Sequence, residues 1–534
     1  MSQTRVCSGH EGLNPFKSFV LDNKSDRLRW RLKFGVFVLF AVSALLVIYS
    51  AFTSETRWLF RCAECRDFPA AKIAPAPGCA LPEQNVTDVS HIVFGIGGSI
   101  KTWKNRKHYS ELWWKPNVTR GFVWLDAEPD PTEPWPETAP PYRISSDWKK
   151  FKFVHSQSAV RLSRIVVDSF REGLPEARWF VMGDDDTVFF PENLAAVLEK
   201  YDHREMYYIG GNSESVEQDA LHAYDMAFGG GGFAISYPLA AELVKIMDGC
   251  LNRYFYFYGS DQRVWACVGE LGVSLTRELG FHQGFVIHLF VIKLRLAQPA
   301  TYPSSPSVVV FNAHDVFGPF HQIDIRGDPF GLLAAHPVAP LVSLHHLDDV
   351  NPLFPNQTQL DSLRAITEAY KMNPARIMQQ SFCYWKRKWS VSVSWGYAVQ
   401  IYPQVLTPKE LEMPLQTFHT WRSWSNGPFI FNVRPVSPDP CKQPVVFYLD
   451  SIEEARKGEV VTTYKKFVGK VQNKCPTGVV GIEKVVVSAA KMDHNEWKQI
   501  PRRQCCEVSK GFWSSTMNVK IRKCKHQEAI IPGG

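Results

Sequence analysis

The sequence lacks a long run of basic residues, and its positive and negative charges nearly balance. Its 534 residues include 60 Lys and Arg and 53 Asp and Glu, which gives a formal net charge of +7. A nucleic-acid-binding surface needs concentrated positive charge, so the composition does not indicate such a partner. The length exceeds that of one ordinary domain and predicts about two to four structural units.

Charge is absent altogether from residues 34–52. About nineteen mostly apolar residues are just enough for one helical span of a bilayer. Four basic residues between positions 27 and 33 precede this stretch, a distribution that keeps the amino end cytoplasmic. A small-residue cleavage site is also lacking after it, which argues against a removable signal peptide. We therefore predict a cytoplasmic tail at 1–33 and a single type II signal anchor at 34–52, with the rest of the chain lumenal.

Cysteine is nearly absent before this anchor, since eleven of the twelve cysteines follow it. In an oxidising lumen they are most simply disulfide partners, and an odd number leaves at least one unpaired or joined to another chain. Sustained hydrophobic periodicity is lacking in residues 53–88, which contain several Pro and Ala. That composition predicts a stem that holds a domain away from the membrane.

Apolar runs alternate with amphipathic segments beyond the stem. Alternation of strands and helices predicts an α/β domain with a parallel, doubly wound sheet, which we place at residues 89–375. The predicted strands lie at 91–96, 121–125, 179–182 and 207–211, and the predicted helices at 106–114, 154–172 and 191–201.

Three consecutive carboxylates, those of Asp184, Asp185 and Asp186, follow the apolar run 179–182. Adjacent carboxylates repel one another, and burying them is costly unless a cation is present. A strand that ends near Gly183 would place them at its carboxyl end, where open α/β sheets bind ligands. Mn²⁺ and Mg²⁺ take oxygen ligands and bridge carboxylates to phosphates, so the triplet predicts a metal and phosphate site. The alternative is a solvated acidic turn.

Four consecutive glycines, Gly229, Gly230, Gly231 and Gly232, precede another apolar run. Without side chains they let another group approach the backbone closely, which favours a packed turn facing a ligand over a flexible hairpin tip. Asp261 then begins an amphipathic segment. A carboxylate at the start of a helix is either a cap or a group that performs catalysis.

The order of these motifs, followed by the sequence Leu279-Gly-Phe-His-Gln283, resembles the Fringe-related glycosyltransferases of plants. These belong to the broader Fringe and β1,3-glycosyltransferase family. The resemblance covers roughly residues 89–355, and the rest resembles the carboxyl-terminal extension of the plant branch, the domain of unknown function 604. It implies a GT-A fold, in which one doubly wound mixed sheet binds Mn²⁺ or Mg²⁺ and a nucleotide-sugar donor such as a UDP-sugar.

The resemblance also implies roles for particular residues. Asp184 and Asp185 would face the donor ribose and the surroundings of the metal, and Asp186 would bind the metal directly. Asp261 would be the catalytic base, and His282 would lie near the metal. The glycines at 229–232 would form a turn beside the acceptor.

The sequence departs from the family pattern where Phe-His-Gln occurs a second time, at 320–322. His282 keeps the upstream context of the motif and His321 keeps the downstream context, so either of them could meet the metal. The residues between the two motifs show no hydrophobic periodicity, and so long a structureless loop is unusual inside a compact domain. We therefore predict an insertion at residues 284–322.

Two further patterns lie towards the carboxyl end. His345 and His346 are adjacent, and neighbouring residues on a strand point to opposite faces, which favours a structural role over a metal site. Strict alternation of Ser with apolar residues at 389–397 predicts a half-buried strand. With the later cysteines, it indicates a small β-rich, disulfide-bonded extension at residues 376–534.

Two functions from different classes remain open for this chain. The first is a metal-dependent, inverting glycosyltransferase that moves a sugar from a nucleotide-sugar to a hydroxyl of a glycan or glycoprotein in the Golgi lumen. The second is a lumenal glycan-binding protein without turnover, whose active site is disrupted by the insertion. The patterns do not indicate the donor sugar or whether the chain dimerises.

Overall fold

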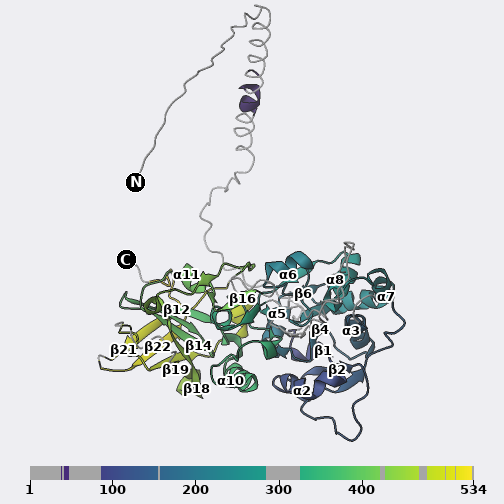
Figure 1. Cartoon of the computed structure of the whole chain (residues 1–534), viewed down its shortest axis with the longest axis horizontal. Coiled ribbons are helices and arrows are strands. Elements are labelled where there is room, and N and C mark those ends of the chain that lie inside the picture. The colour runs from purple at the N-terminus through teal and green to yellow at the C-terminus, as the bar shows by residue number, and fades with distance from the viewer. Residues whose placement is uncertain are drawn as a thin grey trace, which may run out of the picture. The chain divides into compact units, whose positions relative to one another are not determined.

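The computed structural model describes residues 38, 41–46, 86–153, 157–283, 325–420, 427–467, 475, 478–498, 501–511 and 513–531 (Figure 1). The chain divides into two units, Met1–Gln84 and Asn85–Gly534. The predicted insertion, His321 and almost all of the stem lie outside the described residues. In the segment predicted as an anchor, residues 38 and 41–46 are described. The described part of the chain holds no helix with both the length and the apolar character needed to cross a bilayer.

A seven-stranded mixed sheet forms the first part of Asn85–Gly534, in the order β3-β2-β1-β4-β7-β6-β8. The strands β1 to β4 run parallel to their neighbours in this group, whereas β7 is antiparallel to both β4 and β6. The predicted α/β sheet is therefore present, but it is mixed, as the family resemblance implies, and not parallel, as the alternation of strands and helices predicted. The seven strands are β1 (Ile92–Gly97), β2 (Arg120–Leu125), β3 (Tyr142–Ile144), β4 (Trp179–Asp184), β6 (Tyr208–Gly210), β7 (Phe233–Ser236) and β8 (Leu275–Arg277).

Alternate residues of the central strands enter two different cores, one on each face of this sheet. Phe94 of β1 and Val181 of β4 belong to the first core, and their neighbours Val93 and Phe180 belong to the second. Helices cover both faces, as a doubly wound fold requires. On the first face are α2 (Ile100–Glu111) and α5 (Pro191–Leu198), and on the second are α4 (Ile165–Arg171), α7 (Tyr237–Arg253) and α8 (Ser260–Glu270).

The helix predicted at 154–172 is two short helices that meet at Arg164. These are α3 (Gln157–Ser163) and α4, and residues 154–156 are not among those described. Arg164 is 2% exposed and forms ion pairs with Asp248 of α7 and with Asp168. A buried guanidinium needs such ion-pair partners. The interruption between α3 and α4 therefore coincides with the tertiary contacts of Arg164.

Short elements connect the main sheet to the carboxyl-terminal part. A three-stranded sheet has the order β5-β11-β9, and two-stranded sheets pair β10 with β16 and β15 with β17. Their strands are β5 (Val188–Phe189), β9 (Phe281–His282), β10 (Ile325–Gly327), β11 (Ser343–Leu344), β15 (Leu415–Gln416), β16 (Phe418–Thr420) and β17 (Arg434–Pro435). The remaining helices are α6 (Val216–Leu221), α9 (Phe330–Leu333), α10 (Gln359–Met372) and α11 (Pro408–Glu412).

The carboxyl-terminal part contains an eight-stranded sheet in the order β12-β13-β14-β18-β19-β20-β22-β21. Figure 1 shows it at the opposite end of Asn85–Gly534 from β1 and β2. It shares one continuous core with the first face of the main sheet, since Phe94 and Tyr397 belong to the same cluster. The predicted domain boundary after residue 375 falls inside this unit. The strands are β12 (Gln380–Trp385), β13 (Trp389–Ser394), β14 (Ala398–Tyr402), β18 (Val445–Glu454), β19 (Glu459–Lys466), β20 (Lys484–Ala490), β21 (Cys505–Lys510) and β22 (Thr516–Arg522).

The alternating segment at 389–397 does form a strand, β13, but the prediction that it is half-buried is wrong. Its serines are buried as well as its valines. Each buried hydroxyl has a hydrogen-bond partner: Ser390 accepts from the Leu406 amide, Ser392 accepts from the Gln380 side chain, and Ser394 donates to the Leu333 carbonyl. Serine side chains that are hydrogen-bonded in this way can lie on a buried face. The alternation of Ser with apolar residues therefore did not show that both faces of β13 are buried.

The described part of the chain contains four disulfides. Cys383 of β12 is bonded to Cys506 of β21, so the two edge strands of the eight-stranded sheet are joined. The adjacent Cys505 is bonded to Cys524. The other pairs are Cys250–Cys267 and Cys441–Cys475, and the remaining four cysteines lie outside the described residues.

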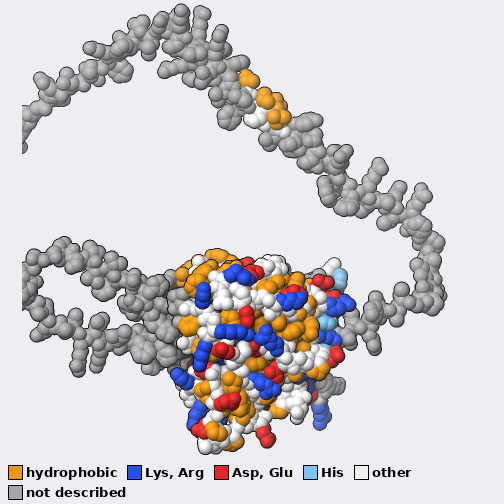
Figure 2. Space-filling view, turned by 90° about the vertical axis from the view of Figure 1, so that its right-hand side faces the viewer, with side chains coloured by type: hydrophobic (Ala, Val, Ile, Leu, Met, Phe, Trp, Pro, Cys, Tyr) orange, Lys and Arg blue, Asp and Glu red, His pale blue; other side chains and the backbone are white. Residues whose placement is uncertain are grey.

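On the face shown in Figure 2, basic and acidic side chains are interspersed with apolar ones. This arrangement agrees with the near balance of charges in the sequence.

Candidate metal and donor site

The three carboxylates Asp184, Asp185 and Asp186 lie at the carboxyl end of β4, in the middle of the main sheet. Gly97 of β1 is opposite Asp184, and its carbonyl accepts the backbone N–H of Asp185 at 2.9 Å. Asp185 is 3% exposed and Asp186 is fully buried, whereas the side chain of Asp184 is 35% exposed. The alternative of a solvated acidic turn is therefore wrong for the last two residues.

Helix α2 supplies a cation and a hydroxyl to this cluster. The hydroxyl of Thr102 donates to Asp185 at 2.7 Å. The guanidinium of Arg106 lies 3.0 Å from a carboxylate oxygen of Asp185 and 3.2 Å from Oδ2 of Asp186. Burial, followed by the adjacent charge of Asp186, raises the pKa of Asp185 to about 6 despite these partners. The sequence prediction began the helix near Arg106, whereas α2 begins at Ile100, directly after the Ser99 cap, so Thr102 was left outside it. Arg106 was inside the predicted helix, but its contact with Asp185, 79 positions away, has no local signal.

His345 and His346 both face Asp186, whereas the sequence argument expected adjacent side chains to point to opposite faces. Nε2 of His345 lies 3.0 Å from Oδ1 of Asp186 and 3.6 Å from Oδ2 of Asp184. Nδ1 of His346 lies 3.1 Å from Oδ2 of Asp186. The alternation argument fails because β11 ends at Leu344 and His346 has a left-handed backbone with φ of 54°. Two adjacent side chains can then converge on one point.

The donor atoms of Asp186, His345 and His346 fit a divalent metal. All three residues are buried, and one ligand atom from each lies within 4.8 Å of the others. Oδ1 of Asp186 and Nε2 of His345 lie 3.0 Å apart but are not aligned as a hydrogen bond, and Oδ2 of Asp186 keeps its ion pair with Arg106. Atoms that are close but not aligned with each other can converge on a third atom. A carboxylate with imidazole nitrogens suits a first-row divalent ion such as Mn²⁺.

The side chain of Gln283 fixes the orientation of the His345 ring. Nδ1 of His345 lies 3.1 Å from Oε1 of Gln283, and the amide oxygen can only accept a hydrogen bond. With the proton on Nδ1, Nε2 faces Asp186 and could offer its lone pair to a metal that displaces any proton there. This is the usual arrangement of a metal-binding histidine, whose second ring nitrogen is held by an outer partner.

The structure does not bring His282 to Asp186. His282 lies in β9, where it is paired with Leu344 of β11, and its Nδ1 lies 2.6 Å from Oε1 of Glu214. Its ring also contacts that of His336, with the ring centres 5.0 Å apart. Successive strand residues point to opposite faces, so the next residue, Gln283, reaches His345 instead. The other predicted candidate, His321, lies outside the described residues.

Asp261 lies in the first turn of α8 and is 5% exposed. Its carboxylate accepts hydrogen bonds from the amides of Gln262 at 2.9 Å and Gly229 at 3.4 Å. The helix cap itself is Gly259, so capping does not account for the position of Asp261. Burial raises the pKa of Asp261 to about 6, and the charge of Asp184 adds to this effect.

The four glycines pack between Asp261 and the histidines, as the prediction of a packed turn requires. A β-carbon on Gly229 would lie 3.5 Å from that of Asp261, and one on Gly230 would lie 1.9 Å from the ring of His345. The hydroxyl of Thr187 donates to the carbonyl of Gly230 at 2.7 Å and also accepts the amide of Asp184. The turn therefore connects the acidic cluster, the histidines and Asp261.

Replacing Gly230 with Ala should displace the His345 ring, because the added methyl group would overlap it. We expect Mn²⁺ affinity to fall at least about tenfold, in the range that loss of an outer partner costs. Titration of the variant with Mn²⁺, followed by electron paramagnetic resonance, measures this. Gly269→Ala in α8 is the matched control, since nothing lies within 4 Å of its added methyl. Unchanged Mn²⁺ affinity in Gly230→Ala would contradict the close packing of this turn on a metal ligand.

Comparison with known proteins gives two matches. A family model described as protein of unknown function, DUF604, matches residues 218–291 and 316–506. The interruption between its two segments lies within the predicted insertion. The beta-1,3-N-acetylglucosaminyltransferase lunatic fringe of Xenopus laevis is 24% identical over 236 residues. That match covers 39% of this chain and 57% of the relative, so the chain spans less than two thirds of the relative's length. The two matches thus show that parts of this chain are similar to the DUF604 family and to a Fringe glycosyltransferase.

Proposed function

We propose that this protein is a metal-dependent, inverting glycosyltransferase that transfers a sugar from a nucleotide-sugar to a hydroxyl of a glycan or glycoprotein. One observation carries the proposal. A buried carboxylate–histidine cluster and a separate buried carboxylate, Asp261, lie on either side of one glycine turn. The similarity to a β1,3-N-acetylglucosaminyltransferase supports the same reaction class.

Asp186, His345 and His346 are the residues that would hold Mn²⁺ or Mg²⁺. When bound, such an ion offsets the pyrophosphate charge and stabilises the departing nucleoside diphosphate as a Lewis acid. Asp184, the most exposed of the three acids, would contact the donor ribose, as the resemblance implies. Asp185 is held by Thr102 and Arg106, so it fixes α2 against the end of β4.

Asp261 would act as the general base. Its carboxylate removes the proton from the acceptor hydroxyl as that oxygen forms a bond to the anomeric carbon of the donor. The bond from that carbon to the phosphate oxygen breaks, and its electron pair leaves with the nucleoside diphosphate. One direct displacement inverts the anomeric centre, so no enzyme nucleophile is needed. The acceptor would lie beside the turn formed by residues 229–232, next to Asp261.

The finer assignments extend this proposal. The Fringe resemblance favours a UDP-sugar donor, and the similarity to a β1,3-N-acetylglucosaminyltransferase supports a β1,3 linkage. The uncharged stretch at 34–52, with basic residues before it, favours a type II anchor in the Golgi membrane with the enzyme in the lumen.

Release of a nucleoside diphosphate tests the proposed activity. The full-length chain is incubated with Mn²⁺, a glycan acceptor mixture and each common nucleotide-sugar in turn. We expect one donor to give release that requires both Mn²⁺ and acceptor. A second chain that lacks residues 284–322 is assayed in parallel. Release by that chain alone would show that the full-length protein is the form without turnover, and release by neither chain would overturn the proposal.

A further inference from the structure

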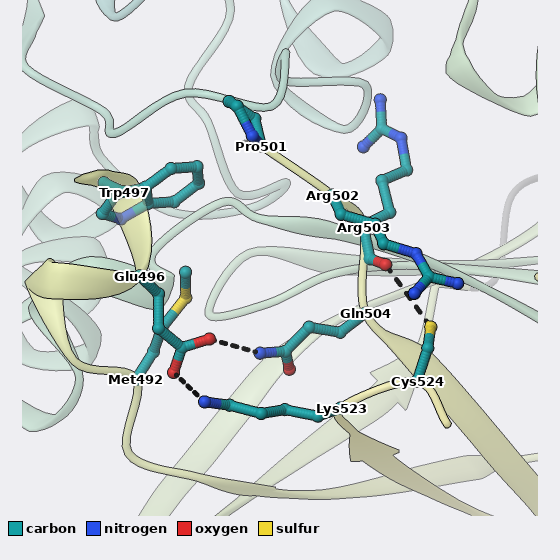
Figure 3. Close-up of a pocket in the computed structure, with 9 residues that line it drawn as sticks. All are labelled: Met492, Glu496, Trp497, Pro501, Arg502, Arg503, Gln504, Lys523 and Cys524. Carbon is teal, nitrogen blue, oxygen red and sulfur yellow. Dashed lines mark hydrogen bonds and ion pairs between the residues drawn. The ribbon is translucent and has the colours of Figure 1, made fainter. Parts of the chain in front are cut away.

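A pocket of about 220 Å³ opens on the carboxyl-terminal sheet, in a different part of the fold from the acidic cluster (Figure 3). It lies between the short helix η7 (His494–Lys498), the segment that leads into β21 and the segment that follows β22. Neither the proposed chemistry nor the disulfide framework explains its lining. The lining residues are Met492, Glu496, Trp497, Pro501, Arg502, Arg503, Gln504, Lys523 and Cys524.

Positive charge exceeds negative charge in this lining. Arg502, Arg503 and Lys523 are basic, and Glu496 is the one acid among the nine residues. Its carboxylate already lies 3.3 Å from Nζ of Lys523 and accepts a hydrogen bond from Gln504 at 3.4 Å. Figure 3 shows this carboxylate turned toward Lys523 and Gln504, with both guanidinium groups lying apart from it.

The two arginines use backbone carbonyls as partners. Arg502 donates to the carbonyl of Glu528 at 2.5 Å, and Arg503 donates to that of Gln380 at 3.3 Å. The guanidinium of Arg503 also lies over the ring of Phe382, 4.8 Å from its centre. Within the described ranges, neither guanidinium lies within 4.0 Å of a carboxylate. A guanidinium has five N–H donors in a planar fork that fits a carboxylate, so donors remain available in both side chains.

A further arginine lies behind the lining. Arg376 is 3% exposed and donates to the side chain of Gln504 at 2.8 Å and to the Ala490 carbonyl at 3.1 Å. Burial lowers the pKa of both Arg376 and Arg503 to about 10, because water is removed from the charged form. Glu496 is the acid that counters this effect at Arg376. Added negative charge would therefore be stabilised in this pocket.

The remaining walls are apolar and rigid. The indole of Trp497 is fixed by a hydrogen bond from Nε1 to the Ala375 carbonyl at 3.2 Å, and Cys524 is held by its disulfide to Cys505. Trp497 is 8% exposed, so the half-buried Met492 and the exposed Pro501 supply most of the apolar wall that could meet the C–H face of a sugar ring. The volume lies below the roughly 300–1,000 Å³ of pockets for drug-sized ligands, so it suits one sugar unit.

We propose that this pocket binds the charged unit of an acidic saccharide, with its carboxylate on Arg502 and Arg503 and its ring against Met492 and Pro501, beside Trp497. The choice of a saccharide rests on the proposed transferase function, since an acceptor glycan must be held by the same chain. The pocket would anchor a uronic-acid unit of that glycan away from the reacting end. Binding here needs no catalysis, so it can be measured without turnover.

The test measures binding of trigalacturonate to the full-length chain by calorimetry, with neutral trigalactose and inorganic phosphate as comparison probes. The same titration on the Asp261→Asn protein separates binding from transfer. We expect trigalacturonate to bind at least about tenfold more tightly than either comparison probe, and equally well to the Asp261→Asn protein. The double variant Arg502→Gln/Arg503→Gln should lose at least about tenfold in affinity.

Two further variants keep the test decisive. Lys484→Gln removes the same type of charge from an exposed position on β20 and should bind as the wild type does. Glu496→Gln removes the competing carboxylate and should bind more tightly. Thermal melting checks that each variant is folded.

The proposal is overturned if trigalactose or phosphate binds as tightly as trigalacturonate, or if a folded double arginine variant binds like the wild type. It is also overturned if the wild-type chain binds none of the three probes.

Discussion

Replacing Asp261 with Asn is expected to slow sugar transfer by about a hundred- to ten-thousand-fold, the usual contribution of a positioned general base. Asn keeps the size of the side chain and an oxygen that can accept from the amide of Gln262, so the turn and the helix should stay in place. Donor affinity should change little, because the proposed donor contacts are made at the end of β4. Single-turnover kinetics with acceptor measures the rate, and calorimetry measures donor binding.

The pH dependence of the rate gives an independent reading of the same residue. Burial raises the pKa of Asp261 to about 6, and a base works only when it is deprotonated. The transfer rate should therefore be maximal at neutral pH and should fall as the pH drops through about 6. This fall at low pH, the acid limb of the pH profile, should be absent from the residual activity of Asp261→Asn. Asp225→Asn, at an exposed carboxylate just before the glycine turn, should leave both the rate and the limb unchanged. Full activity in Asp261→Asn would remove this residue as the base.

Local patterns in the sequence predicted the main sheet well, because its strands are short apolar runs whose neighbours fill two cores. Phe94 and Val93 lie on opposite faces of one strand, so an uninterrupted apolar run was a sound sign of a strand covered on both sides. The position of the acidic triplet at the carboxyl end of a strand was also predictable, since the apolar run before it marks that strand.

What the sequence did not reveal depends on single backbone angles and on distant contacts. The left-handed backbone of His346 turns two adjacent histidines onto one carboxylate, and an alternating pattern cannot express such a turn. The contact of Arg106 with Asp185 joins residues 79 positions apart. The disulfide between Cys383 and Cys506 joins strands that are 123 residues apart, and connectivity of this kind does not follow from cysteine spacing.

Exchanging His345 for Ala should lower the affinity for Mn²⁺ by more than about a hundredfold. Removal of an outer partner of a metal ligand costs about 10- to 100-fold, and His345 is assigned here as a ligand itself. Gln283→Leu removes the hydrogen bond to Nδ1 of His345 and should give the smaller loss. Electron paramagnetic resonance titration of Mn²⁺ reports each affinity directly, without reliance on turnover.

His282→Ala separates the two assignments of the metal histidine. The family resemblance places His282 near the metal, whereas the structure holds its ring against Glu214 and His336. If the geometry is right, His282→Ala keeps an Mn²⁺ affinity close to that of the wild type, with any cost limited to stability. A large loss of Mn²⁺ affinity in His282→Ala, together with wild-type affinity in His345→Ala, would restore the assignment made from the motif. The two variants thus decide whether the histidine that meets Asp186 comes from the end of β9 or from the turn after β11.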